Sequence, residues 1–234
     1  MNPDLTQVRV LAFDVFGTVV DWHATIAREV DALSLGVSGD WFALAWRAGY
    51  VPAMKRVANG ELGWTRLDEL HRSILDSLCD EFGITLDEAG KRALNTVWHR
   101  LDPWPDSVAG LTRLKRRYTI CTLSNGNLGL LTDMAKHAGL PWDCILSAEV
   151  FRKYKPDPAT YLGVAYVFDV EPSQVLMVAA HHSDLDAAKS CGLRTAYVER
   201  PREYGASVPK DVSPRAEHPV HVKDLVDLAR VLGC

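Results

Sequence analysis

The chain has 234 residues, of which 47% are hydrophobic and 24% are charged, and its formal net charge of -4 corresponds to a pI of about 6.1. This balance is typical of a globular protein and excludes disorder as the main state. The sequence has no basic stripe that would suit a nucleic acid, and no apolar run approaches the roughly 20 residues that span a bilayer. Residues 1–9 also lack the order of charged and apolar segments that marks a secretory signal.

The cysteines include no CxxC pair, and they are Cys79, Cys121, Cys144, Cys191 and Cys234. Their odd count, and the position of Cys121 inside an apolar run, argue against a disulfide framework. Because disulfides persist mainly in oxidising compartments, we expect free thiols and a cytoplasmic protein.

Five short apolar runs are near-continuous rather than alternating, at residues 8–13, 118–123, 144–146, 175–179 and 195–198. Such runs are typical of strands buried on both faces of a parallel sheet. Helical stretches lie before or between the later runs, at residues 108–114, 128–138, 159–167 and 183–190. The alternation predicts an α/β protein whose core is a Rossmann-like, doubly wound parallel sheet.

Residues 23–100 interrupt this alternation, because they contain no convincing strand. Apolar residues recur there at helical spacing, as in the set Leu67, Leu70, Ile74, Leu75 and Leu78. The simplest interpretation is a helical cap domain inserted after the first strand. The predicted division is a cap over residues 21–100 and a catalytic core formed by residues 1–20 and 101–234.

Polar groups follow three of the apolar runs, where an open parallel sheet binds its ligands. Asp14 ends the first run and is a candidate nucleophile, although the same carboxylate would also suit the cap of a turn. Ser124 and Asn125 end the second run, where a hydroxyl and backbone N–H groups can hold an anion at a helix N-terminus. The alternative for Ser124 is a plain helix N-cap.

Four further polar side chains of the predicted core are candidates. Lys155 precedes a proline, so its backbone is extended, and its charge would keep Asp14 ionised unless it is an ordinary solvated lysine. Asp184 lies in the first turn of a predicted helix, where it can stabilise the helix dipole or deprotonate a water molecule. His181 and His182 are adjacent, but no third ligand at a suitable spacing supports a metal site. We therefore expect neither a metal nor a cofactor.

Four segments resemble, in order, the four sequence motifs of the haloacid dehalogenase superfamily: Asp14-Val15-Phe16-Gly17-Thr18, Leu123-Ser124-Asn125-Gly126, Tyr154-Lys155-Pro156-Asp157 and the Asp184 loop. The resemblance implies a Rossmann-like core with an inserted cap. Phosphatases of the superfamily carry an aspartate two residues after the nucleophile, which protonates the leaving alcohol and helps to bind magnesium. Phe16 cannot transfer a proton. An aromatic residue there resembles the type II 2-haloacid dehalogenases, whose leaving halide needs no proton.

The resemblance implies a hydrolase in which Asp14 displaces halide from a small 2-haloalkanoic acid and forms an ester. Water held by Asp184 then attacks the Asp14 carboxyl carbon and releases a 2-hydroxy acid. Lys155 would keep Asp14 anionic, while Thr18 and Asn125 would orient it. The substrate or the departing halide would contact the remaining members of the predicted site, Val15, Phe16, Trp46, Arg47, Ser124 and Asn125.

The predicted cap and the fourth motif carry additional signals. Ala45-Trp46-Arg47 resembles the cap segment whose arginine receives the halide in the type II enzymes. Ala179 and His181 replace a serine and an asparagine of the best-known dehalogenase pattern. His181 would replace the asparagine amide as a donor and would narrow the pocket. A narrower pocket favours short haloacids, and fluoroacetate is among the substrates that we expect.

Two alternative functions stay open at this point. One is a magnesium-dependent phosphatase or phosphonate-type hydrolase on the same fold, against which Phe16 argues. The other is a catalytically silent binding protein, against which we set the joint retention of Asp14, Arg47, Ser124, Lys155 and Asp184. The family is often dimeric, but no apolar stripe identifies a homodimer interface. The sequence also leaves the halogen, the chain length and the enantiomer open.

Overall fold

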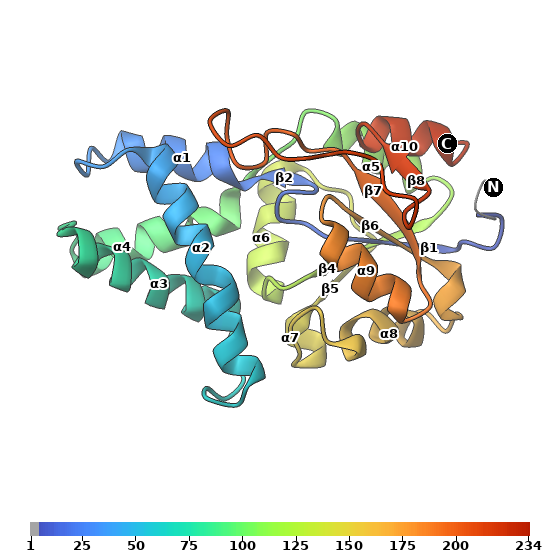
Figure 1. Ribbon diagram of the computed structural model, residues 1–234, viewed down its shortest axis with the longest axis horizontal. Helices are drawn as coiled ribbons and strands as arrows, with labels where there is room; N and C mark the ends of the chain where they lie inside the picture. The colour runs from blue at the N-terminus through green and yellow to red at the C-terminus, as the bar shows by residue number, and fades with distance from the viewer. Residues whose placement is uncertain (1–4) are drawn as a thin grey trace.

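The computed structural model describes residues 5–234 and has a six-stranded parallel sheet at its centre (Figure 1). The strands follow the order β5-β4-β1-β6-β7-β8. Their bounds are β1 Val10–Phe13, β4 Thr119–Ser124, β5 Cys144–Ser147, β6 Val175–Ala179, β7 Arg194–Val198 and β8 Val220–Val222. β1 pairs with β4 on one side and with β6 on the other, so that Phe13 lies opposite Thr122 and Val178. The carboxyl ends of these three strands therefore meet at one edge of the sheet.

Helices cover both faces of the sheet, as successive residues of β1 show. Leu11 and Phe13 belong to one buried hydrophobic cluster, whereas Val10 and Ala12 belong to another. Because side chains alternate along a strand, β1 is apolar on both sides and requires a helical layer on each. The helices of the core are α5 Ser107–Leu114, α6 Leu128–Ala138, α7 Ala148–Phe151, α8 Pro158–Val167, η2 Pro172–Gln174, α9 His182–Ser190 and α10 Leu225–Val231. The predicted doubly wound α/β fold is confirmed.

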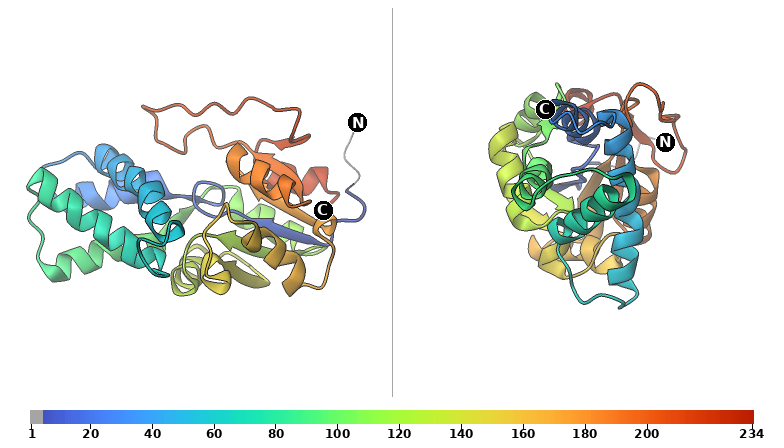
Figure 2. Two further views of the ribbon diagram at one scale, coloured as in Figure 1. Left: turned by 60° about the horizontal axis from the view of Figure 1, so that its bottom comes forward. Right: turned by 90° about the vertical axis from the view of Figure 1, so that its left-hand side faces the viewer.

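A group of helices follows β1 in the chain and lies beside the sheet (Figures 1 and 2). Its members are α1 Trp22–Ala32, α2 Gly39–Ala58, α3 Leu67–Phe82, α4 Glu88–Asn95 and η1 Thr96–Arg100. The chain enters and leaves this group through a short antiparallel ribbon, in which β2 Val20–Asp21 pairs with β3 Asp102–Pro103. Buried residues of the group join one hydrophobic cluster with residues of the core. We call residues 21–100 the cap, and its standing as a separate domain stays a prediction.

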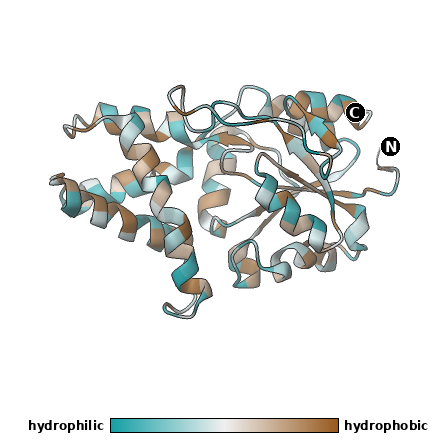
Figure 3. Cartoon of the chain, viewed as in Figure 1, coloured by the Kyte–Doolittle hydropathy of each residue, from teal (hydrophilic) through white to brown (hydrophobic). Residues whose placement is uncertain are grey.

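The segment between β7 and β8, residues 199–219, contains no helix or strand, and we call it the strap. It runs from the core toward the cap (Figure 2), where the ring of Tyr204 lies 5.9 Å from the ring of Trp22 on α1. Colouring by hydropathy shows hydrophobic residues along the strands and many hydrophilic residues along the strap (Figure 3). The strap therefore leaves the sheet after β7, contacts the first helix of the cap and returns to the sheet at β8.

The sequence patterns missed β8, α10 and the ribbon of β2 and β3. β8 has three residues and each ribbon strand has two, which is too short for a hydrophobic period to appear. The first strand also begins at Val10 rather than at Val8. None of the helices in residues 5–234 combines the length and the apolar composition needed to cross a membrane.

Candidate active site

Asp14 lies directly after β1, and its backbone N–H still donates to Val178 O of β6 at 3.0 Å. Gly17 has a φ of +81°, which residues with a side chain rarely adopt, and the turn that it allows brings Thr18 back to Asp14. Thr18 Oγ1 donates to Asp14 Oδ2 at 2.7 Å. Because Thr18 Oγ1 also accepts from the Ala180 N–H at 2.9 Å, its own hydrogen is directed at the carboxylate. The carboxylate is thus held at the carboxyl edge of the sheet.

Lys155 joins the two acidic groups of the site. Its Nζ lies 3.0 Å from Asp14 Oδ1 and 2.5 Å from Asp184 Oδ2, while Tyr161 Oη donates to Asp184 Oδ1 at 2.6 Å. Burial alone would lower the pKa of Lys155, but the two carboxylates raise it above its usual value. Asn125 Oδ1 accepts from the Lys155 backbone N–H at 2.8 Å. Asn125 therefore fixes the loop that carries the lysine, rather than orienting Asp14 directly as predicted.

Asp14 is ionised in this setting. Burial alone would raise the pKa of its carboxyl group, but Lys155, His181 and Thr18 together hold that pKa well below its usual range. Its two oxygens differ, because Oδ1 accepts from Lys155 alone whereas Oδ2 accepts from Thr18 and lies against His181. The site therefore offers a buried carboxylate with one oxygen less engaged than the other.

His181 lies between two carboxylates. Its Nδ1 is 3.1 Å from Asp14 Oδ2, and its Nε2 is 2.7 Å from Glu203 Oε1. An ionised carboxylate can only accept, so both ring nitrogens carry a hydrogen and the ring is an imidazolium. Burial alone would lower the pKa of His181, but Glu203 and Asp14 raise it to about 9. For a carboxyl group the effect of burial is opposite, and burial alone would raise the pKa of Glu203. His181 and Lys210 nevertheless lower that pKa to about 2.

The cap contributes Arg47 and Tyr50 from α2, one helical turn apart. The guanidinium carbon of Arg47 lies 4.2 Å from the ring centroid of Tyr50 and 5.9 Å from that of Trp22, which are distances of cation–π contacts. Arg47 Nε is buried without a partner, and no hydrogen bond or ion pair joins Arg47 to another residue of the range 5–234. The donors of Arg47 are therefore free to bind an anion.

A cavity of about 290 Å³ lies between the cap and the carboxyl edge of the sheet. It is lined by Asp14, Phe16, Arg47, Tyr50, Asn125, Lys155, Pro156, Tyr161, His181, Ser183, Asp184 and Tyr204. Seven of these residues belong to the predicted site, namely Asp14, Phe16, Arg47, Asn125, Lys155, His181 and Asp184. Thr18 is completely buried and does not line the cavity. It acts on the site only through its hydrogen bond to Asp14.

Three predicted substrate contacts do not line this cavity. Trp46 is completely buried inside the cap, where its Nε1 donates to His71 O at 2.9 Å. Neighbouring residues of a helix point about 100° apart, so Trp46 turns away when Arg47 faces the cavity. Ser124 is completely buried, and its Oγ accepts from the backbone N–H two residues later. Val15 packs in the hydrophobic core.

Five residues that line the cavity were not among the predicted ones, and they are Tyr50, Pro156, Tyr161, Ser183 and Tyr204. Glu203, which holds His181 from outside the lining, was also missed. The helical spacing of Tyr50 from Arg47 would have indicated the first of them. Tyr161 lies on α8, where nothing in the sequence distinguishes it from an ordinary core residue. Glu203 and Tyr204 lie in the strap, which has no periodic pattern and no motif.

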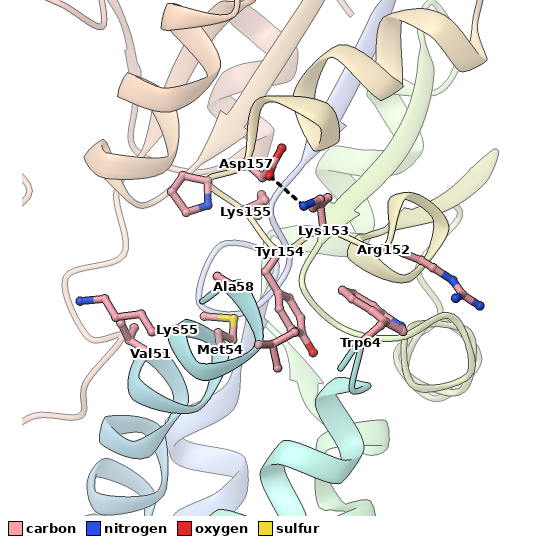
Figure 4. Close-up of a pocket in the computed structure, with 12 residues that line it drawn as sticks. Val51, Met54, Lys55, Ala58, Trp64, Arg152, Lys153, Tyr154, Lys155 and Asp157 are labelled. Carbon is pink, nitrogen blue, oxygen red and sulfur yellow. Dashed lines mark ion pairs between the residues drawn. The ribbon is translucent and has the colours of Figure 1, made fainter. Parts of the chain in front are cut away.

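A second, larger cavity of about 620 Å³ adjoins the first, and the two share Lys155 and Pro156 (Figure 4). Its wall includes the rings of Trp64 and Tyr154, whose centroids are 4.9 Å apart. The exposed side chains of Lys55, Arg152 and Lys153 also line it, and we call these three residues the basic rim. The larger cavity does not include Asp14 or Asp184, so the reactive groups lie in the smaller one.

The carboxylates of the site do not fit magnesium, the ion that the superfamily's phosphatases use. All four oxygens of Asp14 and Asp184 already accept from Lys155, Thr18, His181 or Tyr161, and Mg²⁺ would have to displace a lysine that lies between them. Within the described part of the chain, no group of three or more His, Cys, Asp or Glu side chains has the arrangement to hold a metal ion.

The fold and the buried carboxylates at the carboxyl edge of its sheet agree with one class of hydrolase, and the chain belongs to the haloacid dehalogenase-like hydrolase family, whose model matches residues 8–192. The chain is similar in structure to the L-2-haloacid dehalogenase PA0810, with 45% identity, a TM-score of 0.92 and coverage of 96% of this chain and 99% of that one. It is also similar to the defluorinating L-2-haloacid dehalogenase Rha0230, with 44% identity, a TM-score of 0.93 and coverage of 97% and 96%. (S)-2-haloacid dehalogenase 1 of Pseudomonas sp. (strain CBS-3) is 28% identical over 214 residues, which cover 86% of this chain and 89% of that protein. The resemblance of the four motifs to this superfamily is confirmed.

Proposed function

We propose that this chain is a 2-haloacid dehalogenase, which hydrolyses the carbon–halogen bond of small 2-haloalkanoic acids through an ester on Asp14. The observation that carries the proposal is the pairing of two groups across the smaller cavity. An ionised Asp14 follows the end of β1, and Arg47, with no hydrogen-bond or ion-pair partner among residues 5–234, faces the cavity from the cap. Phe16 lines the same cavity at the position where a phosphatase needs a proton donor.

In the first step, Asp14 Oδ1 attacks the carbon that carries the halogen. The carbon–halogen bond breaks, and its electron pair leaves with the halide. Arg47 receives the halide through its free N–H donors, and the rings of Phe16 and Tyr50 form the less polar part of that subsite. Ser124 is buried away from the cavity, so we propose that Asn125, whose Nδ2 otherwise donates only to the weak acceptor Met54 Sδ at 3.3 Å and to Tyr50, turns an amide N–H to the substrate carboxylate.

In the second step, water attacks Cγ of Asp14 and the bond from Cγ to Oδ1 breaks, so that Oδ1 leaves as the hydroxyl oxygen of the product and the water oxygen stays on Asp14. Asp184 takes a proton from this water and returns it to the departing 2-hydroxy acid, as a general base and then a general acid. Lys155 and Tyr161 fix the Asp184 carboxylate for this exchange. Over a whole turnover, one water molecule is consumed and one halide ion and one proton are released.

The ester mechanism makes a labelling prediction for Asp14. One turnover of excess enzyme with chloroacetate in heavy-oxygen water should place the label in the peptide that contains Asp14, because the water oxygen stays on the aspartate. Asp14→Ala should release no halide, and turnover that is present in the wild type and vanishes in this variant excludes a silent binding protein. Label in the product alone would show that water attacks the substrate directly.

The competing phosphatase function has its own discriminator. Halide release from chloro- and bromoacetate and from both 2-chloropropionate enantiomers should survive chelation by EDTA, and phosphate esters should not be hydrolysed. A requirement for magnesium would instead assign the chain to the phosphatase branch of the family.

The substrate range depends on the groups that line the cavity. His181 is one of them, and because its ring leaves less room beside the reacting carbon than an asparagine amide would, we propose a preference for haloacetates and 2-halopropionates over longer chains and extend the proposal to fluoroacetate. Both N–H groups of His181 are directed at Asp14 and Glu203, so the donors available to fluoride are those of Arg47. Similarity to a structure described as a defluorinating L-2-haloacid dehalogenase supports this extension. Fluoride release measured against chloride release tests it.

Two further properties of the molecule stay proposals. The five cysteines are free, which agrees with a cytoplasmic location. The family resemblance favours a homodimer, which sedimentation of the purified protein would test.

A further inference from the structure

We propose that Glu203 is a positioning residue of the hydrolytic step, which holds His181 as an imidazolium so that His181 and Thr18 stabilise the oxyanion on Asp14 Oδ2. The inference rests on the proposed function, because it starts from the ester on Asp14. Glu203 lies in the strap and outside all four sequence motifs.

A continuous line of charged groups connects the strap with the nucleophile. Asp14 Oδ2 lies 3.1 Å from His181 Nδ1, and His181 Nε2 lies 2.7 Å from Glu203 Oε1. The other oxygen of Glu203 accepts from Lys210 Nζ, which also donates to Ala180 O at 2.6 Å. The side chain of Glu203 is 0% exposed and that of Lys210 is 12% exposed. Water therefore cannot reach the Glu203 carboxylate to replace its partners.

Glu203 also packs against the turn that carries the nucleophile. A Cβ atom on Gly17 would lie 2.2 Å from Glu203 Oε1, so the glycine of the first motif leaves room for this carboxylate. Trp22 Nε1 of the cap donates to the same oxygen at 3.4 Å. Glu203 is thus fixed by contacts from the core, the cap and the strap, which suits a residue that must hold a second side chain in place.

The ionised groups of the cluster balance three against three, with Asp14, Asp184 and Glu203 opposed by Lys155, His181 and Lys210. Asp21 at the start of α1 and Tyr204 on the strap are further titratable groups that feel the charge of Glu203. If the charge of Glu203 were removed, His181 would lose the closer of its two carboxylates and the cluster would become positive. Release of the His181 proton would then restore neutrality.

The chemistry of the ester explains why this proton matters. Once Oδ1 of Asp14 is alkylated, Oδ2 is the ester carbonyl oxygen. As water forms its bond to Cγ and gives a proton to Asp184, the carbonyl electron pair moves onto Oδ2. Thr18 and His181 already lie at hydrogen-bond distance from Oδ2, and a charged donor stabilises such an oxyanion more than a neutral one. When the adduct collapses, the pair returns to the carbonyl, the bond from Cγ to Oδ1 breaks, and Asp184 protonates the departing oxygen.

The substitution Glu203→Gln tests the inference, because it keeps the shape of the side chain and removes its charge. With chloroacetate and rapid quenching, halide should appear in a burst at a near-normal rate, followed by a slow phase. Hydrolysis of the ester should slow by about tenfold, so mass analysis should find the alkylated Asp14 peptide accumulating. The basic limb of the hydrolysis rate should also move to lower pH, and Glu203→Asp should restore part of both effects.

The chain offers a matched control in Glu199, which lies in the same strap and whose Oε1 is 2.7 Å from His221 Nε2. Glu199→Gln removes a glutamate–histidine pair outside the cavity and should leave both half-reactions unchanged. If Glu203→Gln does not fold because Lys210 loses its partner, the double variant Glu203→Gln/Lys210→Gln keeps the buried strap neutral. Nitrogen-15 NMR of the wild-type protein needs no variant, and it should show both His181 nitrogens protonated at pH 7.

Two results would overturn the inference: a neutral His181 at pH 7 in the wild-type protein, or a folded Glu203→Gln variant in which no ester accumulates. Failure of the proposed function would look different, because the wild-type protein would then release no halide from any haloacid. Equal ester accumulation in Glu199→Gln would also count against a specific role of Glu203.

Discussion

Arg47 is a half-buried arginine whose donors have no partner among residues 5–234, and its guanidinium lies against two aromatic rings. We expect Arg47→Lys to slow halide release by about tenfold to a hundredfold, because a lysine keeps the charge but loses the planar set of donors. Hydrolysis of a preformed ester should change little, since only the first step expels halide.

Single-turnover halide release, followed by decay of the ester, separates the two steps for Arg47. Arg28→Lys is a matched control, because Arg28 is 58% exposed on α1 and pairs with Asp102 at the surface. Equal rates in Arg47→Lys and wild type would remove Arg47 from the halide site.

His181 also makes the stability of the protein depend on pH. Its pKa is about 9 in the folded protein and about 6.5 in an unfolded chain. A group whose pKa rises on folding stabilises the fold fully below the unfolded value and loses that contribution as the pH rises through the folded value. The free energy of unfolding should therefore fall between about pH 6.5 and pH 9.

Urea unfolding of wild type and His181→Asn at pH 6.5 and pH 9.5 measures this contribution. The decrease should be smaller in the variant, whereas His137→Asn, which removes a histidine 42% exposed at its side chain, should behave like wild type. A decrease of the same size in all three proteins would assign the pH dependence to other groups.

At the scale of elements, the stability of the fold depends on close packing of the helices against one another. A Cβ atom on Gly110 of α5 would lie 2.6 Å from the backbone of Leu225 at the start of α10. Gly110→Ala should destabilise the protein by about 2 kcal/mol, because the two helices must separate. For a chain of this length the change corresponds to a decrease of about 5 °C in Tm, while the folded protein should keep its kcat.

The control for Gly110 is Gly129→Ala on α6, where the nearest atom outside the local helix lies 4.0 Å from the added Cβ. Alanine favours a helix over glycine by about 0.5–1 kcal/mol, so this variant should be as stable as wild type or slightly more stable. Equal Tm values for the two variants would show that the contact between α5 and α10 can relax.

At the scale of the whole molecule, charge is distributed unevenly. The chain has a net charge of -4, yet the basic rim of Lys55, Arg152 and Lys153 lines the larger cavity next to the reactive one (Figure 4). An anionic substrate should therefore be attracted to this side of the protein. Lys55→Ala/Arg152→Ala should lower kcat/KM for chloroacetate by about twofold to fivefold at low salt and leave kcat unchanged.

The difference between the rim variant and wild type should vanish as the salt concentration rises, because exposed charges are screened over about 8 Å at physiological ionic strength. Lys136→Ala, which removes an exposed lysine from α6, should match wild type at every salt concentration. A loss of kcat in the rim variant would indicate a direct role at the site instead of steering.

Most of the core could be predicted from the sequence, because buried parallel strands and the helices between them leave local patterns. The end of β1 and the motif after it placed Asp14 and Thr18, and the proline after Lys155 placed that lysine in a loop. Asp184 was predicted from its position after β6. Asp14, Thr18 and Asp184 follow the ends of β1 and β6 within five residues, so chain order brings them to the carboxyl edge of the sheet, whereas α7 separates Lys155 from the end of β5.

Only the tertiary structure decided which side chains face the cavity. Trp46 and Ser124 belong to matching segments but turn into the interior, whereas Tyr50 and Tyr161 face the site without a motif. Glu203 comes from a strap with no periodic pattern, and its contact with His181 depends on how that strap folds across the chain. Local sequence determines strands, helices and turns, but side-chain direction and contacts between distant segments are fixed only by packing, which no local pattern records.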